Sequence, residues 1–215
     1  MEIIKFIIEF IFHIDKHLYV VINNFGVWSY ALLFAIIFAE TGLVVTPFLP
    51  GDSLLFTVGA FAAAGFFHIG WLFTVLVIAA IAGDSINYAI GKRIGDKVFH
   101  QNNSRIFRKE YLDRTHRFFE KYGGKAIILA RFVPVIRTFA PFLAGVGKMN
   151  YGRFLLYNVT GGVLWVSAFV LCGFYFGNTP FVKNNFSMVV WIIIFVSILP
   201  AVIEVLKHKM KPANG

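Results

Sequence analysis

Cysteine is almost missing from this sequence, since Cys172 is the one cysteine in 215 residues. A single cysteine excludes an internal disulfide and a metal cluster built on cysteine ligands. The six histidines are neither spaced as in a zinc motif nor paired with a nucleophile, so the usual signals of a metalloprotease or a phosphatase are also missing. We therefore expect a protein that is not an enzyme and that uses no metal and no cofactor.

Charged residues are also scarce, and acids are the scarcer sign. Charged side chains make up 14% of the chain and hydrophobic ones 58%, with a mean hydropathy of +0.73. This balance leaves too little polar surface to cover a soluble protein of this size. Twenty-six phenylalanines and four tryptophans suit a surface that faces lipid. The composition predicts an integral membrane protein.

The excess of positive charge lies in loops. Lysine and arginine outnumber aspartate and glutamate by 20 to 11, and residues 92–125 and 207–215 hold the excess. Basic loops beside spanning helices stay in the cytoplasm, so we expect a multi-pass protein with a cytoplasmic C-terminus. No nucleic-acid-binding motif accompanies the charge, so nucleic acid is not an expected partner. The N-terminus lacks the basic region and small-residue cleavage site of a cleavable signal peptide.

One apolar run, residues 126–147, carries Arg131 and Arg137. An arginine at the centre of a spanning helix costs about 2.5 to 3.5 kcal/mol, so two in one short run require a functional reason. The run also contains two prolines, and each proline lacks the backbone N–H that would donate a helical hydrogen bond. Backbone that faces lipid does not tolerate such a loss, whereas backbone buried in protein does. We therefore predict a re-entrant hairpin. Its expected break positions are Pro134, Pro141 and Gly145.

A second broken run, residues 27–65, carries the acids Glu40 and Asp52. Its return limb is too short to cross about 30 Å of hydrocarbon, which again predicts a re-entrant hairpin. The expected break positions are Pro47, Pro50 and Gly51. The string PFLPG at 47–51 resembles PFLAG at 141–145, and interrupted segments at corresponding positions of two halves indicate a transporter site near the midplane.

Apolar runs and loop charges assign the rest of the chain. The predicted segments are an amphipathic or spanning N-terminal helix at 1–24, a spanning helix at 70–92, a basic cytoplasmic segment at 93–125, spanning helices at 152–177 and 188–206, and a cytoplasmic tail at 207–215. The two hairpins enter from opposite faces, and each is followed by a spanning helix. The predicted fold is thus an all-α membrane protein built on an inverted repeat. Both of these spanning helices end in Gly-x-x-x-Gly, at Gly91 with Gly95 and at Gly173 with Gly177, which permits close helix approach.

The opposed hairpins bring Glu40 and Asp52 toward Arg131 and Arg137, a set whose charges sum to zero. Arginine pairs suit phosphate, which they bind in bidentate fashion. A lipid phosphate would make the site net negative unless Glu40 or Asp52 took up a proton, so we expect the two acids to couple transport to protons. The alternatives are a buried ion-pair network that only locks the hairpins, and for Asp52 a helix N-cap.

Four further polar residues are candidates for the substrate pathway. They are Asp84, Asn87, Thr138 and Asn158. Asp84 and Asn87 lie one helical turn apart, and they either line the pathway or hydrogen-bond a hairpin break.

The motif Glu40-Thr-Gly with Thr46-Pro47-Phe48-Leu49-Pro50-Gly51-Asp52, together with ARFVPVIRT at 130–138, resembles the bacterial DedA family, also called the SNARE-associated or VTT-domain superfamily. Stretches that resemble sequences of this family occur along nearly the whole chain, from GVWSYALLFAI to SILPAVIEV. The resemblance implies an inner-membrane transporter with two facing re-entrant hairpins. It also implies that Glu40, Asp52, Arg131 and Arg137 match the functional acids and arginines of the family, some of whose members move undecaprenyl phosphate or phosphatidylethanolamine.

We therefore expect a translocase of an anionic lipid phosphate, coupled to protons, in the bacterial inner membrane. Its expected partners are membrane lipids and protons, and self-association into a homo-oligomer is left open. One alternative is a proton-dependent transporter or exchanger of small cations or drugs, in which the acids act and the arginines tune them. The other is a membrane scaffold that transports nothing.

Overall fold

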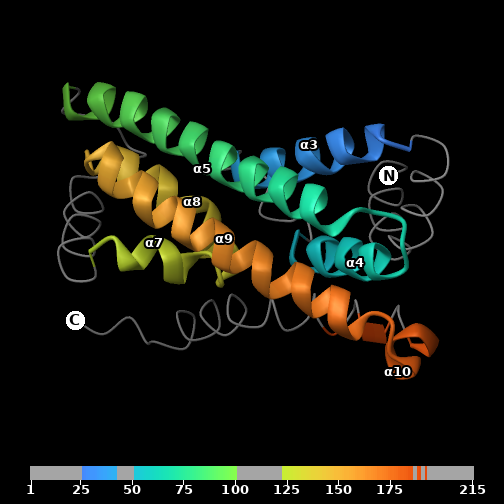
Figure 1. Cartoon of the computed structure of the whole chain (residues 1–215). Coiled ribbons are helices and arrows are strands. Elements are labelled where there is room, and N and C mark those ends of the chain that lie inside the picture. Colours follow the sequence, from blue (N-terminus) through green and yellow to red (C-terminus); the bar gives the residue numbers. More distant parts are fainter. Residues whose placement is uncertain (1–25, 43–50, 101–122, 186–187, 190–191, 193–215) are drawn as a thin grey trace, which may run out of the picture.

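The computed structural model describes residues 26–42, 51–100, 123–185, 188–189 and 192 (Figure 1). Every regular element within these ranges is a helix, as predicted. The segments expected at 1–24 and 207–215, nearly all of the helix expected at 188–206, and residues 101–122 of the basic segment lie outside the described residues. Pro47 and Pro50 lie outside them too.

Two long helices form the frame, α5 (Ile69–His100) and α9 (Tyr151–Phe176). By length and composition, residues Ile69–Gly95 and Tyr151–Phe176 are long and apolar enough to cross a membrane. At 1.5 Å per residue each is about 40 Å long, against about 30 Å of hydrocarbon. Asn150 caps the start of α9, where its side chain accepts a hydrogen bond from the Arg153 N–H at 3.3 Å. The two spans predicted at 70–92 and 152–177 correspond to these helices.

The first helical hairpin consists of α3 (Trp28–Gly42) and α4 (Gly51–Ala63), and we call it hairpin 1. The start of α3 and the end of α4 lie at the same end of the molecule (Figure 1). There the Tyr30 hydroxyl accepts a hydrogen bond from the His68 N–H at 2.9 Å, which ties α3 to the turn before α5. With 15 and 13 residues, these helices are about 20 Å long and too short to span.

The second hairpin, hairpin 2, consists of α7 (Lys125–Ala130) and α8 (Pro134–Val146). It starts and ends at the opposite end of the molecule from hairpin 1, so the tips of the two hairpins meet near the middle (Figure 1). The helix is interrupted at residues 131–133. Pro134 is the first residue of α8, a position where the missing backbone N–H of proline costs no hydrogen bond. A short helix α10 (Pro180–Asn184) follows α9.

Two of the predicted break positions are wrong, because Pro141 and Gly145 lie inside α8. Gly145 serves close packing and does not interrupt the helix. A Cβ on Gly145 would collide with the backbone of Tyr88 and would lie 2.7 Å from the Lys92 nitrogen on α5. Only Gly allows the two backbones to approach this closely.

The helices pair in the same way in both halves. In hairpin 1, α3 packs on α5 and α4 packs on α9, while in hairpin 2, α7 packs on α9 and α8 packs on α5. Each return limb therefore lies against the long helix of the other half.

Glycine contacts repeat this pairing residue by residue. A Cβ on Gly59 would meet the Val170 carbonyl, and one on Gly145 would meet the Tyr88 carbonyl.

The glycines of the two Gly-x-x-x-Gly motifs make equivalent contacts as well. Gly173 and Gly177 of α9 face Phe56 and Ala60 of α4, and Gly91 and Gly95 of α5 face Phe142 and Val146 of α8. A shift of 82 residue numbers relates α5 to α9, and a shift of 86 relates α4 to α8. The frame is thus an internal repeat, in which each half consists of a helical hairpin followed by a long helix, as predicted from the order of the apolar segments.

This register corrects the correspondence inferred from the two similar strings. With a shift of 86, Pro141 corresponds to Leu55 and not to Pro47. The similarity of PFLPG and PFLAG is therefore not a similarity of position.

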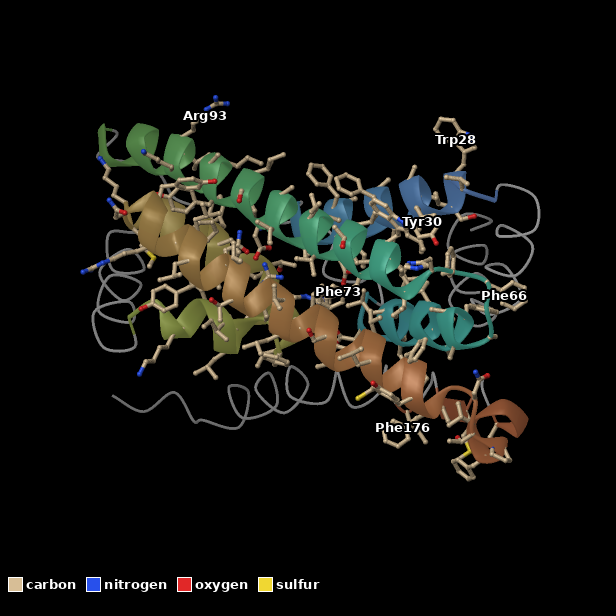
Figure 2. The ribbon with its side chains drawn as sticks, viewed as in Figure 1. Trp28, Tyr30, Phe66, Phe73, Arg93 and Phe176 are labelled. Atoms are coloured by element: carbon tan, nitrogen blue, oxygen red, sulfur yellow. The ribbon has the colours of Figure 1, made fainter. Side chains whose placement is uncertain are left out.

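The outer surface of the described helices is largely apolar. Trp28, Phe66 and Phe176 project away from the helices at one end of the molecule, and Arg93 projects outward from the end of α5 (Figure 2). Apolar side chains from α3, α4, α5 and α9 fill the core between the helices, with Leu55, Leu76 and Val170 fully buried. An apolar surface over a packed interior is what a lipid environment requires.

Candidate functional site

Arg137 is the centre of a buried cluster where the two hairpins meet. It lies in the first turn of α8 and is 3% exposed. Its Nη1 donates to Asp52 Oδ1 at 2.9 Å, and its Nη2 donates to Glu40 Oε1. Both acids belong to hairpin 1, with Glu40 near the end of α3 and Asp52 in the first turn of α4. One guanidinium group of hairpin 2 therefore bridges both limbs of hairpin 1.

Glu40 also covers the start of α4. Its Oε1 accepts a hydrogen bond from the Gly51 N–H at 3.1 Å, so the carboxylate satisfies a backbone donor that no helical partner reaches. A Cβ on Gly51 would collide with this carboxylate. Glycine is therefore required at 51 so that Glu40, which is fully buried, can lie against the helix start.

Trp165 of α9 completes this group, which we call the Arg137 cluster: Glu40, Asp52, Arg137 and Trp165. The indole N–H donates to Asp52 Oδ1 at 2.8 Å. The guanidinium carbon of Arg137 lies 4.8 Å from the centre of the Trp165 ring, within the range of a cation–π contact. The tryptophan is fully buried.

Arg131 forms a second group, which we call the Arg131 cluster: Asp84, Arg131 and Asn158. Arg131 ends α7, and its Nη2 donates to Asp84 Oδ2 at 2.5 Å and to Asn158 Oδ1. The Asn158 amide in turn donates to the Ile81 carbonyl at 3.0 Å. Gly161 leaves room for the arginine, since a Cβ there would lie 3.1 Å from Arg131 Cδ. This cluster ties the end of α7 to both long helices.

Asn87 of α5 lies between the tips of the two hairpins. Its amide nitrogen donates to the Thr41 carbonyl at 3.2 Å and to the Thr138 carbonyl at 2.7 Å. Thr41 belongs to the last turn of α3 and Thr138 to the first turns of α8. Of the two roles left open for Asn87, this geometry matches hydrogen bonding at a hairpin break.

The predicted convergence of acids and arginines holds for three of the four residues. Glu40, Asp52 and Arg137 meet, but Arg131 pairs with Asp84 in place of the acids of hairpin 1. From the sequence, Asp84 is predicted to line the pathway or to hydrogen-bond a hairpin break and Asn158 to line the pathway, but neither is predicted to bind Arg131. Trp165 is not among the predicted site residues. Asp84 carried one usable signal, because an acid inside a spanning helix needs a basic partner.

The two clusters together hold three carboxylates and two guanidinium groups, not the balanced set of four that was expected. Several of their polar atoms have no protein partner within the described part of the chain. These are Glu40 Oε2, Asp84 Oδ1, Arg131 Nε and Nη1, and Arg137 Nε. Buried acceptors and donors of this kind can receive a proton and an anionic ligand, respectively. Among the described residues, no three His, Cys, Asp or Glu side chains are grouped as a metal ion would require.

Comparisons with known proteins agree with the membrane architecture. Residues 49–175, which include Asp52, Asp84, Arg131, Arg137 and Trp165, match the VTT domain family. Protein DedA of Escherichia coli (strain K12) is 54% identical over 217 residues, which cover 100% of this chain and 99% of that protein.

More distant relatives also carry membrane names. An uncharacterized membrane protein of Mycobacterium tuberculosis (strain ATCC 25618 / H37Rv) is 46% identical over 184 residues, 83% of this chain and 81% of that protein. Inner membrane protein YqjA of Escherichia coli (strain K12) is 36% identical over 151 residues, 70% of this chain and 69% of YqjA. No solved structure matches the chain. Because the VTT domain match spans more than half of the chain and the match to DedA runs end to end, this chain is a membrane protein that belongs to the DedA family.

Proposed function

We propose that this protein is a translocase that moves an anionic lipid phosphate across the bacterial inner membrane. The observation that supports this most directly is Arg137, a buried guanidinium of one hairpin bound by both acids of the other. The proposal takes α3–α4 and α7–α8 as re-entrant hairpins that enter from opposite faces. Their tips then place the Arg137 cluster near the bilayer midplane, where substrate sites of transporters built on inverted repeats lie.

The chemistry of the cluster suits exchange between an internal and an external anion. A phosphate oxygen binds a guanidinium with the same geometry as a carboxylate oxygen does. A lipid phosphate can therefore take the place of Glu40 or Asp52 on Arg137, and it can use the unpartnered donors of Arg131. The displaced acid is then a buried charge without its partner, so it takes up a proton. Lipid and proton thus bind together.

Arginine at 137 should be essential for this activity even when charge is kept. Arg137→Lys replaces a planar fork that reaches two carboxylates by a point charge, so we expect lipid transfer to slow by about tenfold or more, as loss of one charge-assisted hydrogen bond implies. The measurement is transfer of labelled phosphatidylethanolamine, and separately of a labelled polyprenyl phosphate, between the leaflets of proteoliposomes.

Arg93→Lys is the matched control, since Arg93 is exposed on α5 and should leave the rate unchanged. A wild-type rate in the Arg137→Lys protein would remove arginine from the transport step. Unchanged activity in a folded protein with Glu40, Asp52 and Arg137 all neutralised would favour the scaffold alternative.

A second candidate is a proton-dependent transporter or exchanger of small cations or drugs. The observation that favours it is the surplus of one carboxylate over the two guanidinium groups in the two clusters. The same vesicles discriminate the candidates. Lipid transfer that speeds up under an imposed pH gradient supports the coupled translocase, whereas proton release driven by added cations, with no lipid transfer, supports the exchanger.

A further inference from the structure

Trp165 is the largest of the fully buried side chains in the described residues, and its contacts are polar as well as apolar. A buried indole N–H needs an acceptor. Here the acceptor is the Oδ1 of Asp52, the same oxygen that accepts from Arg137 Nη1. The ring face of Trp165 meanwhile lies against the Arg137 guanidinium. One side chain thus contacts both members of the ion pair.

Trp165 comes from a helix outside both hairpins. Asp52 is carried by α4 of hairpin 1 and Arg137 by α8 of hairpin 2, while Trp165 is in the middle of α9. Neither hairpin alone fixes where the two charges meet, since each contributes one of them. Trp165 contacts both charges from one helix of the frame, so it can fix the position of each relative to α9.

The internal repeat shows that the frame itself does not require a tryptophan here. With the shift of 82 between α5 and α9, Trp165 corresponds to Gly83. A Cβ on Gly83 would collide with the Thr41 side chain, so the same position in the other half has no room for any side chain. The indole is therefore an addition to one half, at the place where the hairpin charges meet.

We infer that Trp165 is a positioning residue: its N–H fixes the Asp52 carboxylate and its ring restrains the Arg137 guanidinium, so that the pair is held ready for exchange with the lipid phosphate. The part about exchange rests on the proposed function. The part about the ion pair stands on the contacts alone.

Trp165→Phe tests the hydrogen bond, because it keeps an aromatic ring and removes the N–H. We expect transfer of a labelled polyprenyl phosphate, and separately of labelled phosphatidylethanolamine, in proteoliposomes to slow by about tenfold, the factor that corresponds to one hydrogen bond to a charged group. Trp71→Phe is the control, since Trp71 is 68% exposed on α5 and should keep the wild-type rate. A wild-type rate in Trp165→Phe would overturn the positioning role.

A spectroscopic measurement separates this inference from the proposed function. In a variant with Trp28, Trp71 and Trp191 replaced by Phe, all tryptophan emission comes from residue 165. We expect Asp52→Asn and Arg137→Lys each to shift that emission, because each changes a charged group in contact with the indole. An emission spectrum that both substitutions leave unchanged would overturn the contact. Absence of lipid transfer in the wild-type protein would overturn the proposed function instead, and the emission result would still decide whether Trp165 holds the pair.

Discussion

At the scale of single residues, the buried charges are distributed so that the two arginines pair with different acids. Arg131 binds Asp84, and Arg137 binds Glu40 and Asp52. A buried ion pair adds little net stability, but removing one partner leaves an uncompensated charge that costs about 3 to 5 kcal/mol. The two clusters are therefore weak reasons for folding and strong constraints on substitution. Charges retained under this constraint inside a membrane protein are expected to serve its function.

Gly51 gives a prediction at this scale. Gly51→Ala would place a methyl group on the Glu40 carboxylate, so that Glu40 must leave the start of α4. We expect the free energy of unfolding to fall by about 1 to 3 kcal/mol, the cost of an unsatisfied buried donor, and lipid transfer to fall with it. Thermal unfolding in detergent and transfer in vesicles measure the two effects.

Gly152→Ala is the control, because Gly152 is exposed and a Cβ there would meet only the Asn150 side chain at 3.2 Å. Equal stability of Gly51→Ala and Gly152→Ala would mean that Glu40 does not lie against the helix start in the membrane.

At the scale of helices, glycine decides which pairs come close. Gly91 on α5 and Gly173 on α9 occupy equivalent positions, against the backbones of Phe142 and Phe56. A side chain at either place must push two helices apart, since backbone cannot give way as a flexible side chain does. The repeat therefore requires glycine at both equivalent positions, 91 and 173.

The matching prediction is that Gly91→Ala and Gly173→Ala have similar costs. We expect each to lower the free energy of unfolding by about 1 to 3 kcal/mol, as overpacking of a filled interface does. Ala89→Leu adds a larger side chain on an exposed face of α5 and should change little. Thermal unfolding of the three variants tests this, and a large cost at one glycine only would contradict the repeat.

The existence of the helices could be predicted from the sequence, and so could the meeting of Glu40, Asp52 and Arg137, but the partner of Arg131 and the role of Trp165 could not. Composition and apolar length predicted the two long helices. Of the three break positions predicted in residues 126–147, only Pro134 lies at the observed break, directly after residues 131–133. The pairing of Arg131 with Asp84 depends on which way α5 is rotated about its axis, which periodicity does not fix in a helix that is apolar nearly all round. Trp165 lies in the run GGVLWVSAFV, where nothing in the local sequence separates a site residue from a packing residue.

At the scale of the whole molecule, the two ends of the frame should lie on opposite sides of the membrane. The proposed orientation places the end of α5 near Arg93, the start of α9 and the C-terminus in the cytoplasm, by the distribution of basic residues. Two variants in a Cys172→Ser background test this orientation. The cysteine of Arg93→Cys should react with a membrane-impermeant maleimide only in inside-out vesicles, and the cysteine of Phe66→Cys should react with it only in intact cells. The reverse pattern would invert the proposed topology.

The repeated glycine contacts have a consequence for direction. If the proposed translocase moves lipid by tilting one half against the other, its inward-open and outward-open forms are held by equivalent backbone contacts. The packing energies of the two forms then nearly cancel. Any bias toward import or export must then come from what the repeat does not duplicate, namely Trp165, the unequal acids and bases, and the ion gradients that act on them.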